Sequence, residues 1–294
     1  MEENTVVRPD PVGENPAADR SAPPIVPILI LVVLIIMVGV NALANILPIN
    51  NLTTGEVSDQ LGNLFAPAGL TFSIWGLIYL LLAAFTVFQF FPPVSAEAAG
   101  RLKQVRLFFT LSSLANAAWI FCWHYLALEA SLVLMLVILI CLILVNLKLG
   151  GKKLPFKEAL FLRLPFSIYF GWITVATVAN VTALLVDLKW NRFGLSEAFW
   201  TVVILVVATI IAVAVINRQK DWAYGAVVAW AYAGILIKHL DPLPEGFGGQ
   251  HIGVIVTVSI CLGFVAAASL LAVLGRTVRV VSAGRQAPDG PAKP

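Results

Sequence analysis

Long apolar segments dominate this sequence and constrain its fold more than any other feature. About 20 apolar residues in an α-helix cross the roughly 30 Å of hydrocarbon in a bilayer. Only 12% of the residues are charged, which is too few for the surface of a soluble domain of this size. The sequence therefore predicts an all-α integral membrane protein with about eight transmembrane helices. The predicted spans are 25–47, 68–91, 105–126, 129–149, 161–186, 197–217, 222–240 and 251–275.

The positions of the basic residues predict the orientation of these spans. Cytoplasmic loops of membrane proteins carry an excess of Lys and Arg. If the N-terminus is cytoplasmic and eight spans alternate, only Lys189, Arg192 and Lys238 of the 19 Lys and Arg residues lie outside. Adding or removing one span would destroy this bias. We therefore expect a multi-pass protein of the bacterial cytoplasmic membrane, with both termini cytoplasmic.

Three segments outside the spans differ in composition. Residues 1–24 are polar and rich in Pro and Ala, which predicts a disordered cytoplasmic tail, and 276–294 are predicted to be a basic disordered tail. The first outside loop, 48–67, has no Lys or Arg and is the longest connection in the chain. Its length is compatible with a lid over a functional site and equally with a plain solvated linker.

The central portions of the predicted spans contain no ionisable residue. Ion-driven carriers usually place a carboxylate near the middle of the membrane, so this composition argues against an ion-driven pump or antiporter. The three cysteines lie within apolar runs, at spacings typical of neither a disulfide framework nor a metal site. They are Cys122, Cys141 and Cys261, and we expect buried structural thiols.

Aromatic and asparagine side chains recur in the spans at spacings that place them on single helix faces. An Asn in hydrocarbon needs a partner, so these faces should turn toward protein or a wet cavity. One aromatic-lined cavity, open to the outside beneath the loop 48–67, would use all of them. Interhelical hydrogen bonds and ring packing without a ligand explain the spacing equally well. The stripes are Asn41 and Asn45; Trp75 and Tyr79; Ser112, Asn116, Trp119 and Trp123; and Tyr169, Trp172, Ala176 and Asn180.

Three of these stripes resemble segments of the tryptophan-rich sensory protein / translocator protein family (TspO/MBR). Residues 72–79, Phe-Ser-Ile-Trp-Gly-Leu-Ile-Tyr, look like the family's second-helix segment Phe-x-Pro-Val-Trp-Thr-x-Leu-Tyr without its proline. Residues 114–119 resemble the third-helix Leu-Asn-x-x-Trp, and residues 169–180 share the fifth-helix spacing Tyr-x-x-Trp-x-x-x-Ala-x-x-x-Asn. The resemblance covers 25–187, whereas the spans within 197–275 have no counterpart in the five-helix family. The chain therefore resembles an enlarged branch of the TspO/MBR family, with additional C-terminal spans.

The resemblance implies a five-helix bundle over residues 25–187, with three additional transmembrane helices over 197–275. It also implies a pocket for a flat hydrophobic ligand such as a porphyrin or haem, with no cofactor required. Indole rings stack on a planar macrocycle, and an amide can hydrogen-bond its polar edge. The ligand-binding residues expected from the stripes and the resemblance are Asn45, Trp75, Tyr79, Asn116, Trp119, Trp123, Tyr169, Trp172, Ala176 and Asn180.

The leading functional hypothesis is non-enzymatic binding of a porphyrin- or haem-type tetrapyrrole, in sensing or transport. The alternatives are a transporter or facilitator of another small hydrophobic solute, and a porphyrin-degrading activity. His124, and His239 with Asp241, are the only candidates for acid–base catalysis, and interfacial polar residues are the favoured interpretation of both histidines. The expected partners are a hydrophobic small molecule and membrane lipid, not nucleic acid, and a homodimer is left open.

Overall fold

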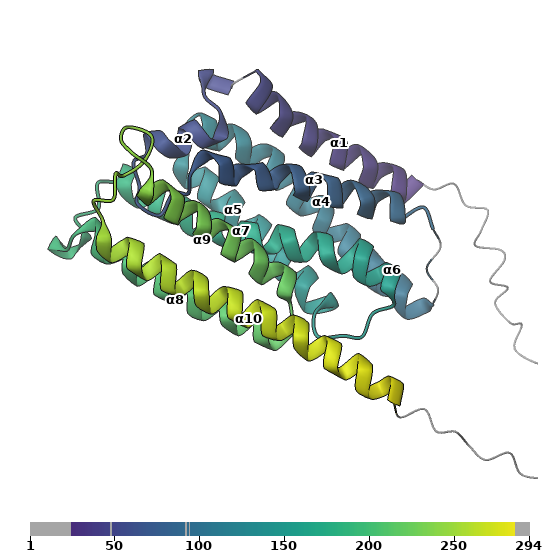
Figure 1. Cartoon of the computed structure of the whole chain (residues 1–294). Helices are drawn as coiled ribbons and strands as arrows, with labels where there is room; N and C mark the ends of the chain where they lie inside the picture. The colour runs from purple at the N-terminus through teal and green to yellow at the C-terminus, as the bar shows by residue number, and fades with distance from the viewer. Residues whose placement is uncertain (1–24, 48, 92, 94, 286–294) are drawn as a thin grey trace, which may run out of the picture.

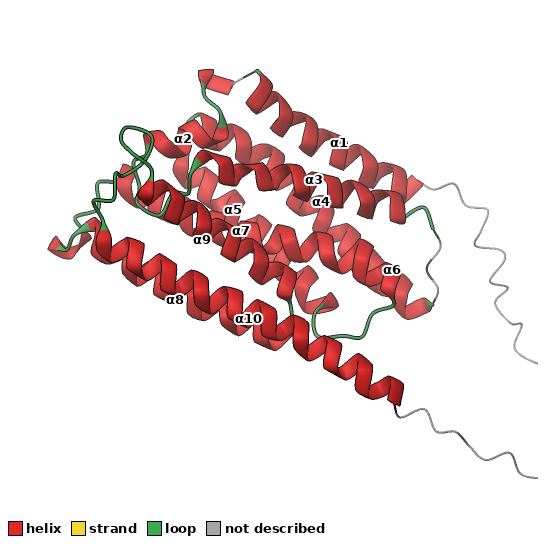
Figure 2. Ribbon diagram, viewed as in Figure 1, coloured by secondary structure: helices red, strands yellow, loops and turns green. Residues whose placement is uncertain are grey.

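The computed structural model describes residues 25–47, 49–91, 93 and 95–285; the predicted tail 1–24 lies outside them. Within this part the chain forms helices joined by loops, as Figure 2 shows, and has no strand. Eight helical segments are long and apolar enough to cross a membrane, which confirms the predicted all-α multi-pass fold. The long helices are α1 (Ile25–Ile46), α3 (Ile74–Phe88), α4 (Ala96–His124), α5 (Leu128–Leu149), α7 (Leu164–Asp187), α8 (Glu197–Gln219), α9 (Trp222–Leu240) and α10 (Ile252–Arg285).

Shorter helical segments connect or extend these long helices. A π-helical turn precedes α7, at the point where Pro165 cannot donate a backbone hydrogen bond. The other short segments are 3₁₀ turns and two short α-helices. In chain order the short segments are η2 (Ile49–Asn51), α2 (Thr54–Gln60), η3 (Gly69–Ser73), α6 (Phe156–Glu158), η4 (Ala159–Arg163, the π turn) and η5 (Arg192–Gly194).

Polar side chains fix where several long helices begin. The Ser95 hydroxyl accepts a hydrogen bond from Ala98 N (3.1 Å), and the Ser196 hydroxyl accepts one from Phe199 N (3.2 Å). Such caps satisfy backbone donors that a helix start leaves free. Because of the Ser95 cap, α4 begins well before the predicted span at 105. At the other end of the chain α10 continues to Arg285, so residues 276–285 of the predicted disordered tail are helical.

Five of the long helices form a closed ring. In this five-helix ring α1 lies between α3 and α4, α5 contacts both α4 and α7, and α7 contacts α3 (Figure 1). Helix α9 packs on the outside of α7, and α8 and α10 pack on α9 and on each other. The approach of α7 to α9 requires Gly171, because a Cβ there would lie 2.7 Å from the carbonyl oxygen of Tyr224. The last three helices are therefore joined to the ring mainly through α7.

The two ends of the bundle differ in what they carry. The loop end carries residues 49–68, and the tail end is the opposite end, where α1 begins and α10 ends (Figure 1). At the loop end, Lys238 pairs with Asp59 at 3.0 Å, and Lys189 and Arg192 line a cavity beside Asn63. The three cations predicted to lie outside therefore share one end of the bundle. Which side of the membrane this end faces stays a prediction.

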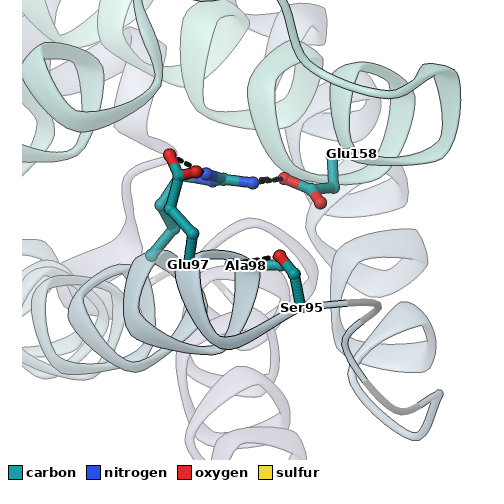
Figure 3. A network of polar contacts seen from close by, with 5 residues as sticks. Ser95, Glu97, Ala98 and Glu158 are labelled. Carbon is teal, nitrogen blue, oxygen red and sulfur yellow. Dashed lines mark hydrogen bonds and ion pairs between the residues drawn. The ribbon is translucent and has the colours of Figure 1, made fainter.

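A buried ion pair joins α4 to α6 at the tail end (Figure 3). The Arg101 guanidinium donates to Glu97 at 2.6 Å and to Glu158 at 2.7 Å. The Glu158 side chain is almost fully buried, whereas that of Glu97 is exposed. Since a buried carboxylate is unfavourable without a partner, Arg101 is what makes this position acceptable.

Asp221 is a second buried acid at the tail end, and it connects α5, α7 and α9. Its carboxylate accepts hydrogen bonds from Ser167 Oγ (2.6 Å), Asn146 Nδ2 (3.2 Å) and the backbone N of Tyr224 (3.2 Å). Arg163 lies 4.0 Å from the same carboxylate. Asp221 therefore caps α9 and at the same time supplies the acceptor that three buried donors share.

We expect Asp221→Ala to lower the free energy of unfolding by about 2–4 kcal/mol, because it leaves these donors buried without an acceptor. The measurement is unfolding in mixed micelles with a rising fraction of SDS, followed by circular dichroism. Asp187→Ala, which removes an exposed acid from the end of α7, is the matched control. Equal losses in the two variants would contradict this role of Asp221.

Candidate functional site

An aromatic cluster lies where α3 meets α7 in the five-helix ring. It consists of Phe72, Trp75, Tyr79, Tyr169 and Trp172. The ring centroid of Trp75 lies 5.5 Å from that of Tyr79 (stacked), 5.9 Å from Tyr169 and 6.2 Å from Trp172 (both edge-on). Phe72 contacts Trp172 edge-on at 5.7 Å. Tyr169 and Trp172 are buried, whereas Trp75 and Tyr79 are half-buried. The predicted stripes on α3 and α7 therefore do face each other.

A pair of buried amides adjoins this cluster. Asn41 Nδ2 donates to Asn116 Oδ1 at 2.7 Å, which joins α1 to α4. Asn116 is fully buried, and the hydroxyl of Tyr169 lies close to it. Trp119, one turn further along α4, is also buried and stacks on Trp123 at 5.7 Å. The predicted residues of α1, α3, α4 and α7 are therefore brought together in one region.

Four buried polar atoms in this region have no hydrogen-bond partner among the described residues. They are Asn116 Nδ2, Trp119 Nε1, Tyr169 OH and Trp172 Nε1. The Asn116 amide and the Tyr169 hydroxyl interact with each other, whereas no described residue satisfies the two indole N–H groups. An unsatisfied buried donor costs roughly 1–3 kcal/mol, so these indoles are unfavourable unless another molecule satisfies them. The three N–H groups can only donate, and the tyrosine hydroxyl can also donate. The arrangement suits a flat molecule that carries oxygen acceptors such as carboxylates.

Other predicted site residues have partners or lie outside the cluster. Asn180 Oδ1 accepts from Ser131 Oγ at 3.0 Å, which joins α7 to α5. Trp123 Nε1 donates to the carbonyl of Thr54 at 3.2 Å. These contacts are of the kind expected if the polar side chains only join helices to one another and bind no ligand. Asn45 is exposed, and its amide folds back on the carbonyl of Asn41, although the spacing predicted a shared face. Ala176 lies on α7, one turn after Trp172, and is partly buried.

The segment 49–68 is a folded cap on the loop end and not a solvated linker. Val57 and Phe65 are buried in the core, at 0% and 1% exposure. Thr53 and Glu56 form a capping box that starts α2. A solvated linker was one of two possibilities that the loop length allowed, and burial of these apolar side chains excludes it.

Two fully buried histidines hold this cap in place, and both lie at span ends, where interfacial polar residues were expected. His124 Nδ1 lies 3.1 Å from the carbonyl of Ile49, and His124 Nε2 lies 3.2 Å from Thr54 Oγ1. His239 Nε2 lies 2.9 Å from the carbonyl of Leu64. Each ring therefore donates to a backbone carbonyl in the cap. The His239 ring lies edge-on to that of His251, with centroids 5.7 Å apart. The described residues contain no group of three or more acids, Cys and His that could hold a metal ion.

Two cavities lie at the loop end beside the cap, and no residue of the aromatic cluster lines either of them. The first, of about 380 Å³, lies between the end of α7 and the start of α8 and is lined by Trp190, Arg192 and Trp200. The second, of about 530 Å³, is lined by Asp59 and Lys238 among others. Sequence spacing could not identify these residues, because they come from loops and helix ends far apart in the chain.

A protein-family model for TSPO-like proteins matches residues 27–273. The chain belongs to the TSPO-like family. The match is longer than the resemblance at 25–187 and includes α8, α9 and most of α10. This agrees with the expectation of an enlarged branch of the family, since the matched pattern includes the three helices that the five-helix family lacks. The comparisons with curated proteins and with solved structures returned no match.

We expect His124→Leu to loosen the cap of this TSPO-like protein, because it removes both side-chain hydrogen bonds to 49–54. Amide hydrogen exchange over α2 should accelerate about tenfold, as expected when one or two hydrogen bonds are lost. The control is Tyr125→Leu, which changes the exposed neighbouring side chain. If exchange in α2 is the same in both variants, His124 does not anchor the cap.

Proposed function

We propose that this protein binds a flat, hydrophobic ligand with acidic groups, of the porphyrin or haem type, inside the five-helix ring. It acts in sensing or transport and not as an enzyme. The observation that carries the proposal is the two buried indole N–H groups of Trp119 and Trp172, which have no partner among the described residues, next to the interacting side chains of Asn116 and Tyr169. Membership in the TSPO-like family, together with the pocket that the resemblance implies, supports the same location.

The chemistry of these side chains suits a tetrapyrrole. Indole and phenol rings offer flat apolar surface against which a macrocycle stacks. Donors fixed in an uncharged interior replace the water that carboxylates lose when they enter the protein. These side chains therefore suit the macrocycle and its carboxylates. The proposal includes no bond between a protein side chain and iron.

Binding requires the cluster to open, because its rings are in contact. The η3 turn that leads into α3 is held against α9: Trp230 Nε1 donates to the Thr71 carbonyl at 3.0 Å, and Ala68 N donates to the Gly234 carbonyl at 3.0 Å. Trp75 and Tyr79 lie beyond this attachment and are only half-buried. The ligand therefore enters by separating the middle of α3 from α7, with the loop end of α3 remaining fixed.

The test is binding of protoporphyrin IX to the protein in lipid nanodiscs, followed by the Soret band and by quenching of tryptophan fluorescence. The double variant Trp75→Ala/Trp172→Ala removes two stacking rings and should weaken binding at least about tenfold. Trp222→Ala is the matched control, because this tryptophan is partly exposed at the start of α9. It should bind as the unmodified protein does.

A third variant, Asn116→Leu, removes the Nδ2 donor without removing a ring; it also removes the acceptor of Asn41 Nδ2, so its helix content and thermal unfolding are compared with those of the unmodified protein. It should also weaken binding of protoporphyrin IX, but not of the dimethyl ester, in which the acids are blocked. If the double variant binds as tightly as the Trp222→Ala control, the ligand does not occupy this cluster and the proposal fails.

A further inference from the structure

The smaller loop-end cavity has the properties of a binding site, and it lies apart from the aromatic cluster. Its volume of about 380 Å³ lies in the range of small-molecule sites. The indole rings of Trp190 and Trp200 form part of its wall, with centroids 5.1 Å apart and planes inclined at 56°. Trp200 Nε1 donates to the carbonyl of Arg192 at 2.9 Å, which fixes that ring. Leu185 and Ile204 add apolar wall.

Two cations and one acid line this cavity. They are Lys189, Arg192 and Glu197. Arg192 Nη1 lies 3.5 Å from one oxygen of Glu197, whose other oxygen accepts from Leu64 N at 3.1 Å. Both oxygens of the acid are therefore engaged. Arg192 Nε is buried and has no partner among the described residues, so the guanidinium retains a donor that this part of the chain does not use.

The backbone that presents these groups is strained. Lys189, Arg192 and Phe193 have positive φ angles of 50°, 56° and 53°. Left-handed conformation costs roughly 1–2 kcal/mol for a residue with a side chain, and such residues concentrate at functional sites. The neighbouring larger cavity differs in charge, because Asp59, Asp241 and Glu245 line it with Lys238. An anionic ligand is therefore directed to the cavity at Arg192.

We propose that this cavity binds a small aromatic carboxylate. The carboxylate lies on the guanidinium of Arg192, beside Lys189, and the aromatic ring packs against Trp190 and Trp200. A planar guanidinium matches a carboxylate in geometry and charge, and flat indole walls favour a flat ligand. The site uses no residue of the aromatic cluster, so it stands independently of tetrapyrrole binding.

The test compares two probes of the same shape on the protein in zwitterionic nanodiscs, by calorimetric titration. The probes are 2-naphthoate and its neutral analogue 2-naphthalenemethanol. We expect saturable binding of 2-naphthoate, at least about tenfold tighter than that of the alcohol, because charge-assisted hydrogen bonds are about twice as strong as neutral ones. Arg192→Gln should abolish this preference.

Two further variants separate recognition of the anion from general disruption. Glu197→Gln removes the competing negative charge but keeps an oxygen that can accept from Leu64 N, so it should bind 2-naphthoate as tightly or more tightly. Arg218→Gln, which removes an exposed cation near the other end of α8, should change nothing. Trp172→Ala should likewise leave 2-naphthoate binding intact.

Several outcomes would overturn the proposal. Equal affinity for the two probes, or equal effects of Arg192→Gln and Arg218→Gln, would show that Arg192 does not hold the anion. Displacement of 2-naphthoate by phosphatidylglycerol in the nanodisc would assign the cavity to a lipid headgroup and not to a soluble carboxylate. Loss of binding in Trp172→Ala would place the probe in the aromatic cluster.

Discussion

A polar side chain within hydrocarbon has no water to bond, so it must find its partner inside the protein. In this protein that constraint is met by the hydrogen bond between Asn41 and Asn116, at 2.7 Å, which joins α1 to α4. The bond fixes which face of α4 turns inward. Trp119 lies on the same face, so it turns inward as well. On α7, the bond between Asn180 and Ser131 acts in the same way, because it orients the helix face that also carries Trp172. The position of the aromatic cluster inside the ring therefore follows from the hydrogen bonds that these buried amides make.

Because of the same constraint, the ring interior and the loop end of the bundle carry different kinds of side chain. The ring interior offers aromatic surface and hydrogen-bond donors without formal charge, which suits a large flat ligand whose carboxylates are stabilised by hydrogen bonds. The loop end offers cations, acids and cavities at the level where water is available. The cap at 49–68, held by His124 and His239, belongs to the loop end and contributes Asn63 to both cavities. A ligand in the ring and a ligand at the loop end therefore meet different side chains.

Much of the architecture could be predicted from the sequence, because hydrophobic runs and helical spacing are local signals. The eight spans and the facing stripes with Trp75 and Trp172 are of this kind. The start of α4 could not be placed, since apolarity marks the membrane and a helix capped by Ser95 extends beyond it. The buried position of His124 depends on the Ile49 carbonyl and the Thr54 hydroxyl, 75 and 70 residues away in the chain, which no local pattern reports. The Arg192 cavity likewise assembles residues from loops and helix ends.

The central claim is that unpartnered indole N–H groups inside the ring bind a ligand. The eight tryptophans can be labelled with ¹⁵N, and their indole signals followed by NMR in nanodiscs while protoporphyrin IX is added. The account predicts large shifts for Trp119 and Trp172, which gain an acceptor, and small ones for Trp222 and for Trp230, which already donates to Thr71. Saturable porphyrin binding that leaves the signals of Trp119 and Trp172 unchanged would contradict it.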